Sequence, residues 1–171
     1  MVSVKIDDKD LQRVAGEGID SFLELVIKCM RDAIGGEITA ENMQQMSTAQ
    51  TVLMGYATLR DELMDGGFIQ LIYNGYGPFF FHNPFDAAVR QWGLVDLCRL
   101  MRRAKKQYQR HCGEIEREMT DEEFMALYEK LPDFEDLDDE FVSNEEQWSA
   151  QVAYYVDEHL EELVQINKLT N

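Results

Sequence analysis

Residues 19–34 read IDSFLELVIKCMRDAI, and this stretch decides the fold class. Its apolar residues recur at steps of three and four, which is the period of an α-helix with one buried face. These residues are Ile19, Phe22, Leu23, Val26, Ile27, Met30 and Ile34. Gly35 and Gly36 follow and end the pattern. The same period returns along most of the chain, so the sequence predicts an all-α fold, a helical bundle.

A second helix is predicted from about residue 39 to residue 63. It ends before Gly66 and Gly67, two adjacent glycines that permit a positive φ and a close approach of backbone. The next residues, 68–73 (FIQLIY), are too few for periodicity to separate helix from strand. Both assignments stay open for this segment.

Two local sequences are typical of helix starts. Asn83 before Pro84 fits an N-cap with proline at the first helical position, where the missing N–H costs nothing. Thr120 with Glu123 fits a capping box, which predicts a short helix that ends before Pro132. We expect an acid-rich connection over residues 133–140 and a last helix over residues 144–166.

The negative charge of the chain is concentrated in its last third. Residues 113–171 contain 19 Asp and Glu but three Lys and Arg, whereas residues 1–112 contain 14 acidic and 13 basic residues. A chain of 171 residues is expected to form one domain, residues 1–171, here with a near-neutral body and an acidic segment. This field attracts cationic surfaces and repels phosphates, so we expect a basic DNA-binding protein or another cationic protein as partner, and no direct nucleic-acid binding.

The carboxylates of the acidic segment are therefore the candidate partner-binding residues. They are Glu114, Glu116, Glu118, Asp121, Glu122, Asp133, Glu135, Asp136, Asp138, Asp139 and Glu140. If the segment formed one helix, its acids would follow one another at about 4.7 Å, against about 1.7 Å for the charges of duplex DNA. A likeness to DNA therefore requires acidic elements side by side, within one chain or across a dimer.

One predicted helix face is basic instead. From Leu94 onward, apolar residues form one face, and the other carries Arg99, Arg102, Arg103, Lys105, Lys106 and Arg110. The net charge of -17 opposes an approach to DNA. We therefore interpret this face as solvated, or as a docking surface for the acidic segment of the same chain.

The sequence offers no catalytic, metal or cofactor site. No serine lies in a nucleophile-elbow pattern, and His111 and Cys112, as neighbours on a helix, do not face each other. Asp136, Asp138 and Glu140 have the spacing of a calcium loop, but the turn glycine and the bidentate glutamate are missing. Three cysteines without a C-x-x-C pair indicate reduced thiols. With no apolar run of 18 residues and no signal-peptide pattern, we expect a cytoplasmic protein that is not an enzyme, uses no cofactor and enters no membrane.

Residues 65–74, DGGFIQLIYN, resemble the signature of a bacterial family of acidic, mostly helical proteins, the DNA-mimic protein domain family. The likeness runs from Leu53 to about Ala104 and more loosely over residues 134–159. Residues 64–65 (MD) and 75–78 (GYGP) depart from the family pattern, which has two Asn and a Ser-containing turn there. The resemblance implies an all-helical fold, a capacity to form homodimers, and an acidic surface that occupies the DNA site of a regulatory protein.

The motif residues of this signature are Glu62, Gly66, Gly67, Phe68, Gln70 and Asn74. We expect Glu62, Gln70 and Asn74 to satisfy the backbone groups that the Gly-Gly turn exposes, because buried polar groups are usually hydrogen-bonded. A ligand pocket lined by the same side chains is the alternative.

The leading hypothesis is a non-enzymatic protein that occludes the DNA-binding face of a transcription factor or nucleoid protein. An immunity or antitoxin protein that neutralises a basic nuclease would suit the same charge. A small-molecule sensor using the region from Gly66 to Asn74 belongs to a different class. Acidic residues that serve solubility alone are the fourth reading.

Overall fold

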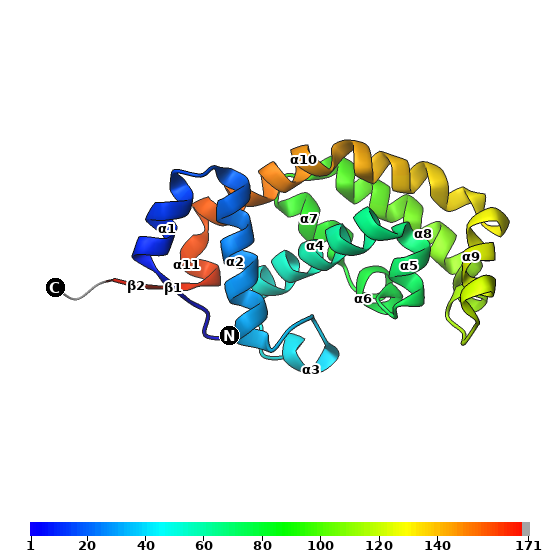
Figure 1. Ribbon diagram of the computed structural model, residues 1–171, viewed down its shortest axis with the longest axis horizontal. Helices are drawn as coiled ribbons and strands as arrows, with labels where there is room; N and C mark the ends of the chain where they lie inside the picture. The colour runs from blue at the N-terminus through cyan, green and yellow to red at the C-terminus, as the bar shows by residue number, and fades with distance from the viewer. Residues whose placement is uncertain (169–171) are drawn as a thin grey trace. The chain divides into compact units, whose positions relative to one another are not determined.

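Helices form almost all of the regular structure. The structure, a computed structural model, describes residues 1–168, which contain eleven α-helices, one 3-10 helix and two strands of three residues each (Figure 1). The predicted all-α fold is confirmed. Two compact units can be distinguished: unit 1 joins Met1–Thr58 to the C-terminal part of the chain from Gln147, and unit 2 is the uninterrupted segment Leu59–Glu146. The single domain expected for residues 1–171 stays a prediction.

Unit 1 brings its first and last strands side by side (Figure 1). Its elements are β1 (Lys5–Asp7), α1 (Asp8–Ala15), α2 (Ile19–Ile34), α3 (Ala40–Met43), the first part of α4 (Thr48–Asp65), the last part of α10 (Glu135–Glu158), α11 (Leu160–Leu163) and β2 (Gln165–Asn167). The helix predicted at residues 19–34 is confirmed as α2. The last helix predicted over residues 144–166 is wrong at both ends, since α10 begins earlier and stops at Glu158. Ile166 pairs with Ile6 in the parallel ladder, so a tertiary contact overrides the local helical pattern there.

The predicted helix over residues 39–63 is divided into α3 and α4. Ser47 and Gln50 form a reciprocal cap at the start of α4: Gln50 N donates to Ser47 Oγ at 3.1 Å, and Ser47 N donates to Gln50 Oε1 at 3.0 Å. The amide nitrogen of the fully buried Gln50 also donates to the carbonyl oxygens of Val2 (2.9 Å) and Leu163 (2.8 Å). Gln50 therefore caps the start of α4 and also connects it to the N-terminal segment at Val2 and to the end of α11 at Leu163.

Unit 2 is arranged around one long helix, α8. Its elements are the end of α4, α5 (Gly67–Tyr73), α6 (Gly77–His82), α7 (Phe85–Gln91), α8 (Val95–Ile115), α9 (Asp121–Lys130), a 3-10 turn η1 (Pro132–Phe134) and the first part of α10. Helices α5, α6, α7 and η1 all pack against α8 (Figure 1). As expected, α8 buries Leu97, Met101 and Ala104 on one face. Residues 68–73, which periodicity left open, lie in a helix.

The two predicted helix starts have different outcomes. The capping box is confirmed: Glu123 N donates to Thr120 Oγ1 at 3.2 Å, and Thr120 N donates to Glu123 Oε2 at 2.8 Å, a bond that lowers the pKa of Glu123. The N-cap predicted at Asn83 is wrong. Its side-chain amide donates backwards to Phe79 O at 3.1 Å, and α7 begins only at Phe85, after Pro84. The last carbonyl oxygens of a helix have no partner within the helix, and the Asn83 amide satisfies one of these at the end of α6.

The acid-rich connection expected over residues 133–140 is also wrong. It is the turn η1 followed directly by the first turns of α10, which starts at Glu135. Phe134, Leu137 and Phe141 are buried at steps of three and four, and carboxylates in the first turn of a helix are favoured by its dipole. Most of the acids of this segment therefore project from a regular helix.

The turn between α4 and α5 is fixed by two side chains from later in unit 2. Gly67 has a φ of +74°, a conformation that the glycine pair permits. The Tyr128 hydroxyl donates to Gly66 O at 2.7 Å, and Phe68 N donates to Asp138 Oδ1 at 2.8 Å. This turn thereby holds α5 against both α9 and α10.

We predict that Gly67→Val lowers the free energy of unfolding by about 1–3 kcal/mol, because a β-branched residue strains at positive φ. A side chain at this position would also meet the carboxylate of Asp138. Gly75→Val is the matched control, since Gly75 has a φ of +90° but nothing within 4 Å of an added Cβ. Urea unfolding measures both variants. Equal losses in the two would show that the approach of Asp138 adds nothing.

Candidate partner-binding surface

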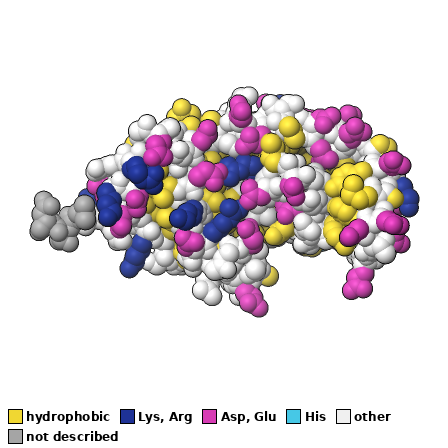
Figure 2. Space-filling model, in the orientation of Figure 1, with side chains coloured by type: hydrophobic (Ala, Val, Ile, Leu, Met, Phe, Trp, Pro, Cys, Tyr) yellow, Lys and Arg dark blue, Asp and Glu magenta, His cyan; other side chains and the backbone are white. Residues whose placement is uncertain are grey.

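Nine of the eleven candidate carboxylates are exposed, and all of them lie in unit 2. We define the acidic surface as these nine residues: Glu114, Glu116, Glu118, Asp121, Glu122, Asp133, Glu135, Asp136 and Asp139. They come from the end of α8, the loop after it, the first turn of α9, η1 and the start of α10. Figure 2 shows Asp and Glu side chains over α9 and the first half of α10. Carboxylates that are spread along the sequence thus share a few neighbouring elements.

The first half of α10 has a high local charge density. Residues 135–146 contain seven acidic residues in a helical length of about 18 Å, or one per about 2.6 Å. Duplex DNA carries one charge per about 1.7 Å, whereas the four exposed acids of this stretch follow one another at about 4.5 Å, so α10 alone falls short of DNA and neighbouring acidic elements must contribute. Glu135, Asp139 and Glu146 are exposed at helical steps that place them on one side of α10.

Asp138 is not a free surface carboxylate. It is largely buried and accepts the hydrogen bond from Phe68 N at the start of α5. Burial raises the pKa of Asp138 to about 7, and the charges of Asp139 and Glu135 add to this shift, although the bond from Phe68 N opposes it. Its role in the structure is to cap α5.

Glu140 and Asp133 contact α8. Glu140 forms an ion pair with Arg103, and Asp133 Oδ2 lies 3.7 Å from His111 Nε2. These contacts are those expected if the basic face of α8 serves as a docking surface for the acidic segment. Arg102 pairs elsewhere, with Asp86 of α7 at 3.0 Å.

Other basic residues of α8 are exposed to solvent, as the alternative interpretation expects. They are Arg99, Lys105, Lys106 and Arg110. Arg99 pairs with Asp96 on its own helix at 3.1 Å. The two readings of the basic face therefore apply to different residues of one helix.

The polar residues of the Gly-Gly signature bond one another. Asn74 Nδ2 donates to Glu62 Oε2 at 2.8 Å, and Gln70 Nε2 donates to Asp65 Oδ2 at 2.9 Å and to Glu62 Oε2 at 3.2 Å. The expectation that they bond the backbone of the turn is wrong. Tyr128 does so instead, together with Asp138, and no spacing in the sequence connects either residue to the turn.

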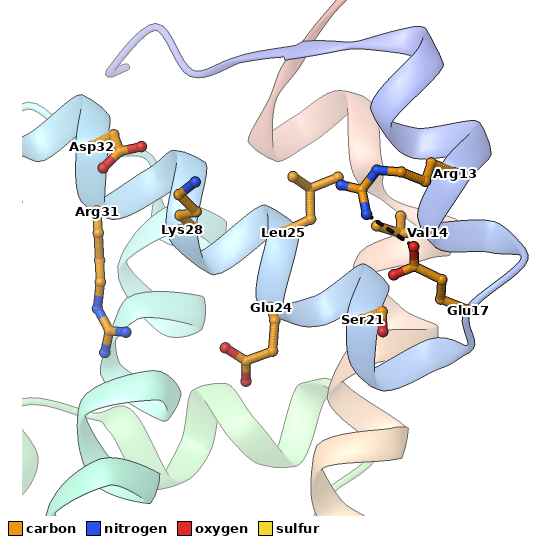
Figure 3. Close-up of a pocket in the computed structure, with 9 residues that line it drawn as sticks. All are labelled: Arg13, Val14, Glu17, Ser21, Glu24, Leu25, Lys28, Arg31 and Asp32. Carbon is orange, nitrogen blue, oxygen red and sulfur yellow. Dashed lines mark hydrogen bonds and ion pairs between the residues drawn. The ribbon is translucent and has the colours of Figure 1, made fainter.

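Unit 1 contains a hollow of about 560 Å³ along α1 and α2 (Figure 3). Its lining alternates in charge: Arg13 pairs with Glu17 at 3.0 Å, and Lys28 and Asp32 follow along α2. This mixture offers no single-sign site for an ion, and we assign it no function. Within residues 1–168, no group of three or more His, Cys, Asp or Glu side chains could hold a metal ion, and no helix could cross a membrane.

Two comparisons with known proteins bear on this surface. The sequence model of the family described as DMP19-like protein matches residues 44–159. The DNA mimic protein DMP19 of Neisseria meningitidis serogroup B (strain ATCC BAA-335 / MC58) is 28% identical over 130 residues, which cover 75% of this chain and 78% of that protein. Residues 44–159 include the Gly-Gly turn and all nine residues of the acidic surface.

We predict that Asp138 makes the stability of the protein fall as pH rises. Its folded pKa of about 7 lies above the ordinary value of 3.8, so its contribution is complete below about pH 3.8 and is lost as pH rises through about 7. Between about pH 5.5 and pH 8 this loss should amount to about 2 kcal/mol. Urea unfolding at the two pH values measures it.

Asp138→Asn should remove this part of the pH dependence, because an amide oxygen still accepts from Phe68 N but does not ionise. Asp139→Asn removes an exposed neighbouring charge and should leave most of the dependence in place. An Asp138→Asn protein with the same pH dependence as the parent would contradict the assignment.

Proposed function

Because the chain belongs to the DMP19-like protein family, we propose that it is a DNA mimic. Its acidic surface would occupy the DNA-binding face of a basic DNA-binding protein, a transcription factor or nucleoid protein, and so exclude the duplex. The observation that carries this proposal is the start of α10 at Glu135. A helix presents carboxylates at a fixed spacing, whereas a flexible connection would have to be ordered on binding.

The mechanism is competition between two anions for one cationic surface. A groove or helix that binds phosphates does so through Lys and Arg, whose attraction to carboxylates follows the same Coulomb law. Charge complementarity raises the rate of encounter, and this effect weakens as salt screens the field. No catalytic step is involved.

A two-fold dimer would extend this surface. The local density on α10 is still below that of DNA, and two acidic surfaces related by symmetry would supply a longer anionic strip. A homodimer is therefore part of the proposal.

We predict that neutralising the exposed acids of η1 and α10 slows partner association without unfolding the protein. The variant combines Asp133→Asn, Glu135→Gln, Asp136→Asn and Asp139→Asn, and leaves Asp138 and Glu140 intact because they hold α5 and α8. At low ionic strength, association should slow by about tenfold or more, and the difference should shrink as salt is added. Exposed charges contribute little to stability, so the circular dichroism spectrum should not change.

The control variant has the same change in net charge in unit 1. It combines Asp157→Asn, Glu158→Gln, Glu161→Gln and Glu162→Gln, all of which are exposed. DNA-binding proteins retained by the tagged chain at low salt are mixed with fluorescent duplex DNA, and the displacement of the duplex is followed by anisotropy. The parent and the control should displace the duplex at the same rate, and the neutralised variant should do so about tenfold more slowly at low salt. Equal displacement by all three would remove the acidic surface from the mechanism.

A further inference from the structure

Unit 2 contains a second surface feature, a groove with an apolar wall and an acidic wall. Its volume is about 550 Å³. The apolar wall is formed by the end of α5 and the start of α6, through Ile72, Tyr73 and Pro78. The opposite wall is the segment that follows α8, Glu116, Arg117 and Glu118.

The two walls are held together by tight packing. Gly77 is buried, and a side chain there would collide with the ring of Tyr108 and the carboxylate of Glu116. The hydroxyl of Tyr108 donates to Glu116 Oε1 at 2.6 Å, which fixes that carboxylate at the rim. Arg117 Nη1 lies 3.9 Å from Glu123 Oε2, so its charge is partly offset by α9. The groove is therefore preformed, and the field around it is negative.

An aromatic surface continues from the groove onto α9. The ring of Tyr73 is 4.7 Å from that of Phe124, and Tyr73 is 37% exposed. Figure 2 shows hydrophobic side chains gathered over α5 and α9, with Asp and Glu at their border. An apolar patch with a charged rim is the usual composition of a protein-binding site, with its anchor at the centre and its charges outside.

We propose that this groove receives an aromatic or large aliphatic side chain from a Lys- and Arg-rich segment of the partner protein. The bases that flank this side chain would meet Glu116, Glu118 and the first turn of α9. A second copy of the chain is disfavoured as the occupant, because its own acidic rim would be repelled. The cationic character of the partner rests on the proposed function, but the apolar anchor does not follow from DNA mimicry, since a duplex presents no such side chain.

An apolar anchor would give the mimic selectivity. Attraction between opposite charges favours any basic surface, whereas burial of one side chain in a shaped groove selects segments that carry it at the right position. This contribution is not screened by salt. Binding would then combine a fast, salt-sensitive encounter with a salt-resistant contact.

The test uses two labelled peptides and the full chain. One is a short Lys- and Ala-containing peptide with a single central Trp, and the other has Ala at that place. Anisotropy titrations should show about tenfold tighter binding of the Trp peptide, which corresponds to burial of a fraction of the indole surface. This ratio should persist as salt rises, while both absolute affinities fall.

Two variants locate the site of this preference. Tyr73→Ala and Pro78→Gln both change the apolar wall, and each should reduce the ratio between the peptides to about one. Tyr154→Ala is the matched control, because Tyr154 is a 60% exposed tyrosine in unit 1. Circular dichroism verifies folding, and Pro78→Gln decides the question if the loss of the Tyr73 ring weakens the packing of α9.

The proposal is overturned if the parent binds both peptides equally, or if folded Pro78→Gln keeps the preference for Trp. Its failure can be told apart from failure of the proposed function. If the protein displaces duplex DNA but does not prefer the Trp peptide, the proposed DNA mimicry stands and the proposed apolar anchor is wrong. A Trp preference without displacement of DNA would leave the groove as a site for another cationic protein.

Discussion

The hydrogen bond from Phe68 N to the carboxylate of Asp138 is the contact on which unit 2 depends. It joins the start of α5 to the first turn of α10, and it is possible only because Gly67 has no side chain in the space that the carboxylate occupies. Without this bond, the first turn of α10 would lose its polar attachment to α5. The acids that flank Asp138 lie on a regular helix, and the inward-facing carboxylate of Asp138 attaches this helix to α5.

The charged residues of unit 2 have two roles: some form ion pairs between helices, and others are exposed to solvent. Glu140 forms an ion pair with Arg103 of α8, and this pair fastens the acidic segment to the basic helix. The exposed acids of η1 and α10 repel one another, which costs stability that the buried apolar residues must offset. Neutralising the exposed acids should therefore destabilise the protein less than replacing Asp138 or Glu140, which contact other helices.

The sequence predicted the class of fold because a 3.6-residue period is a local property. It predicted the cap at Thr120 for the same reason, and it showed that the glycine pair permits the positive φ that Gly67 adopts. It failed where a distant partner decides the outcome: Ile166 is in a strand because Ile6 lies opposite, and Asn83 turns back to the preceding helix. For the candidate surface, composition identified the carboxylates, but only the fold separates Asp138, which is buried against α5, from Asp139, which is exposed. The contribution of Tyr73 and Phe124 to a common surface was equally hidden, since they are 51 positions apart.

Gln50 places a restriction on the order in which the chain acquires its structure. Its amide bonds the carbonyl oxygens of Val2 and Leu163, so this part of unit 1 is complete only when the C-terminal segment is present. Unit 2 is one uninterrupted segment and contains no such closure. Because local contacts form faster than distant ones, the acidic unit can fold on the ribosome while the first 58 residues still wait for their partner strand. Unit 2, which carries the acidic surface, would thus fold first, and unit 1 would fold once residues 147–167 have been synthesised.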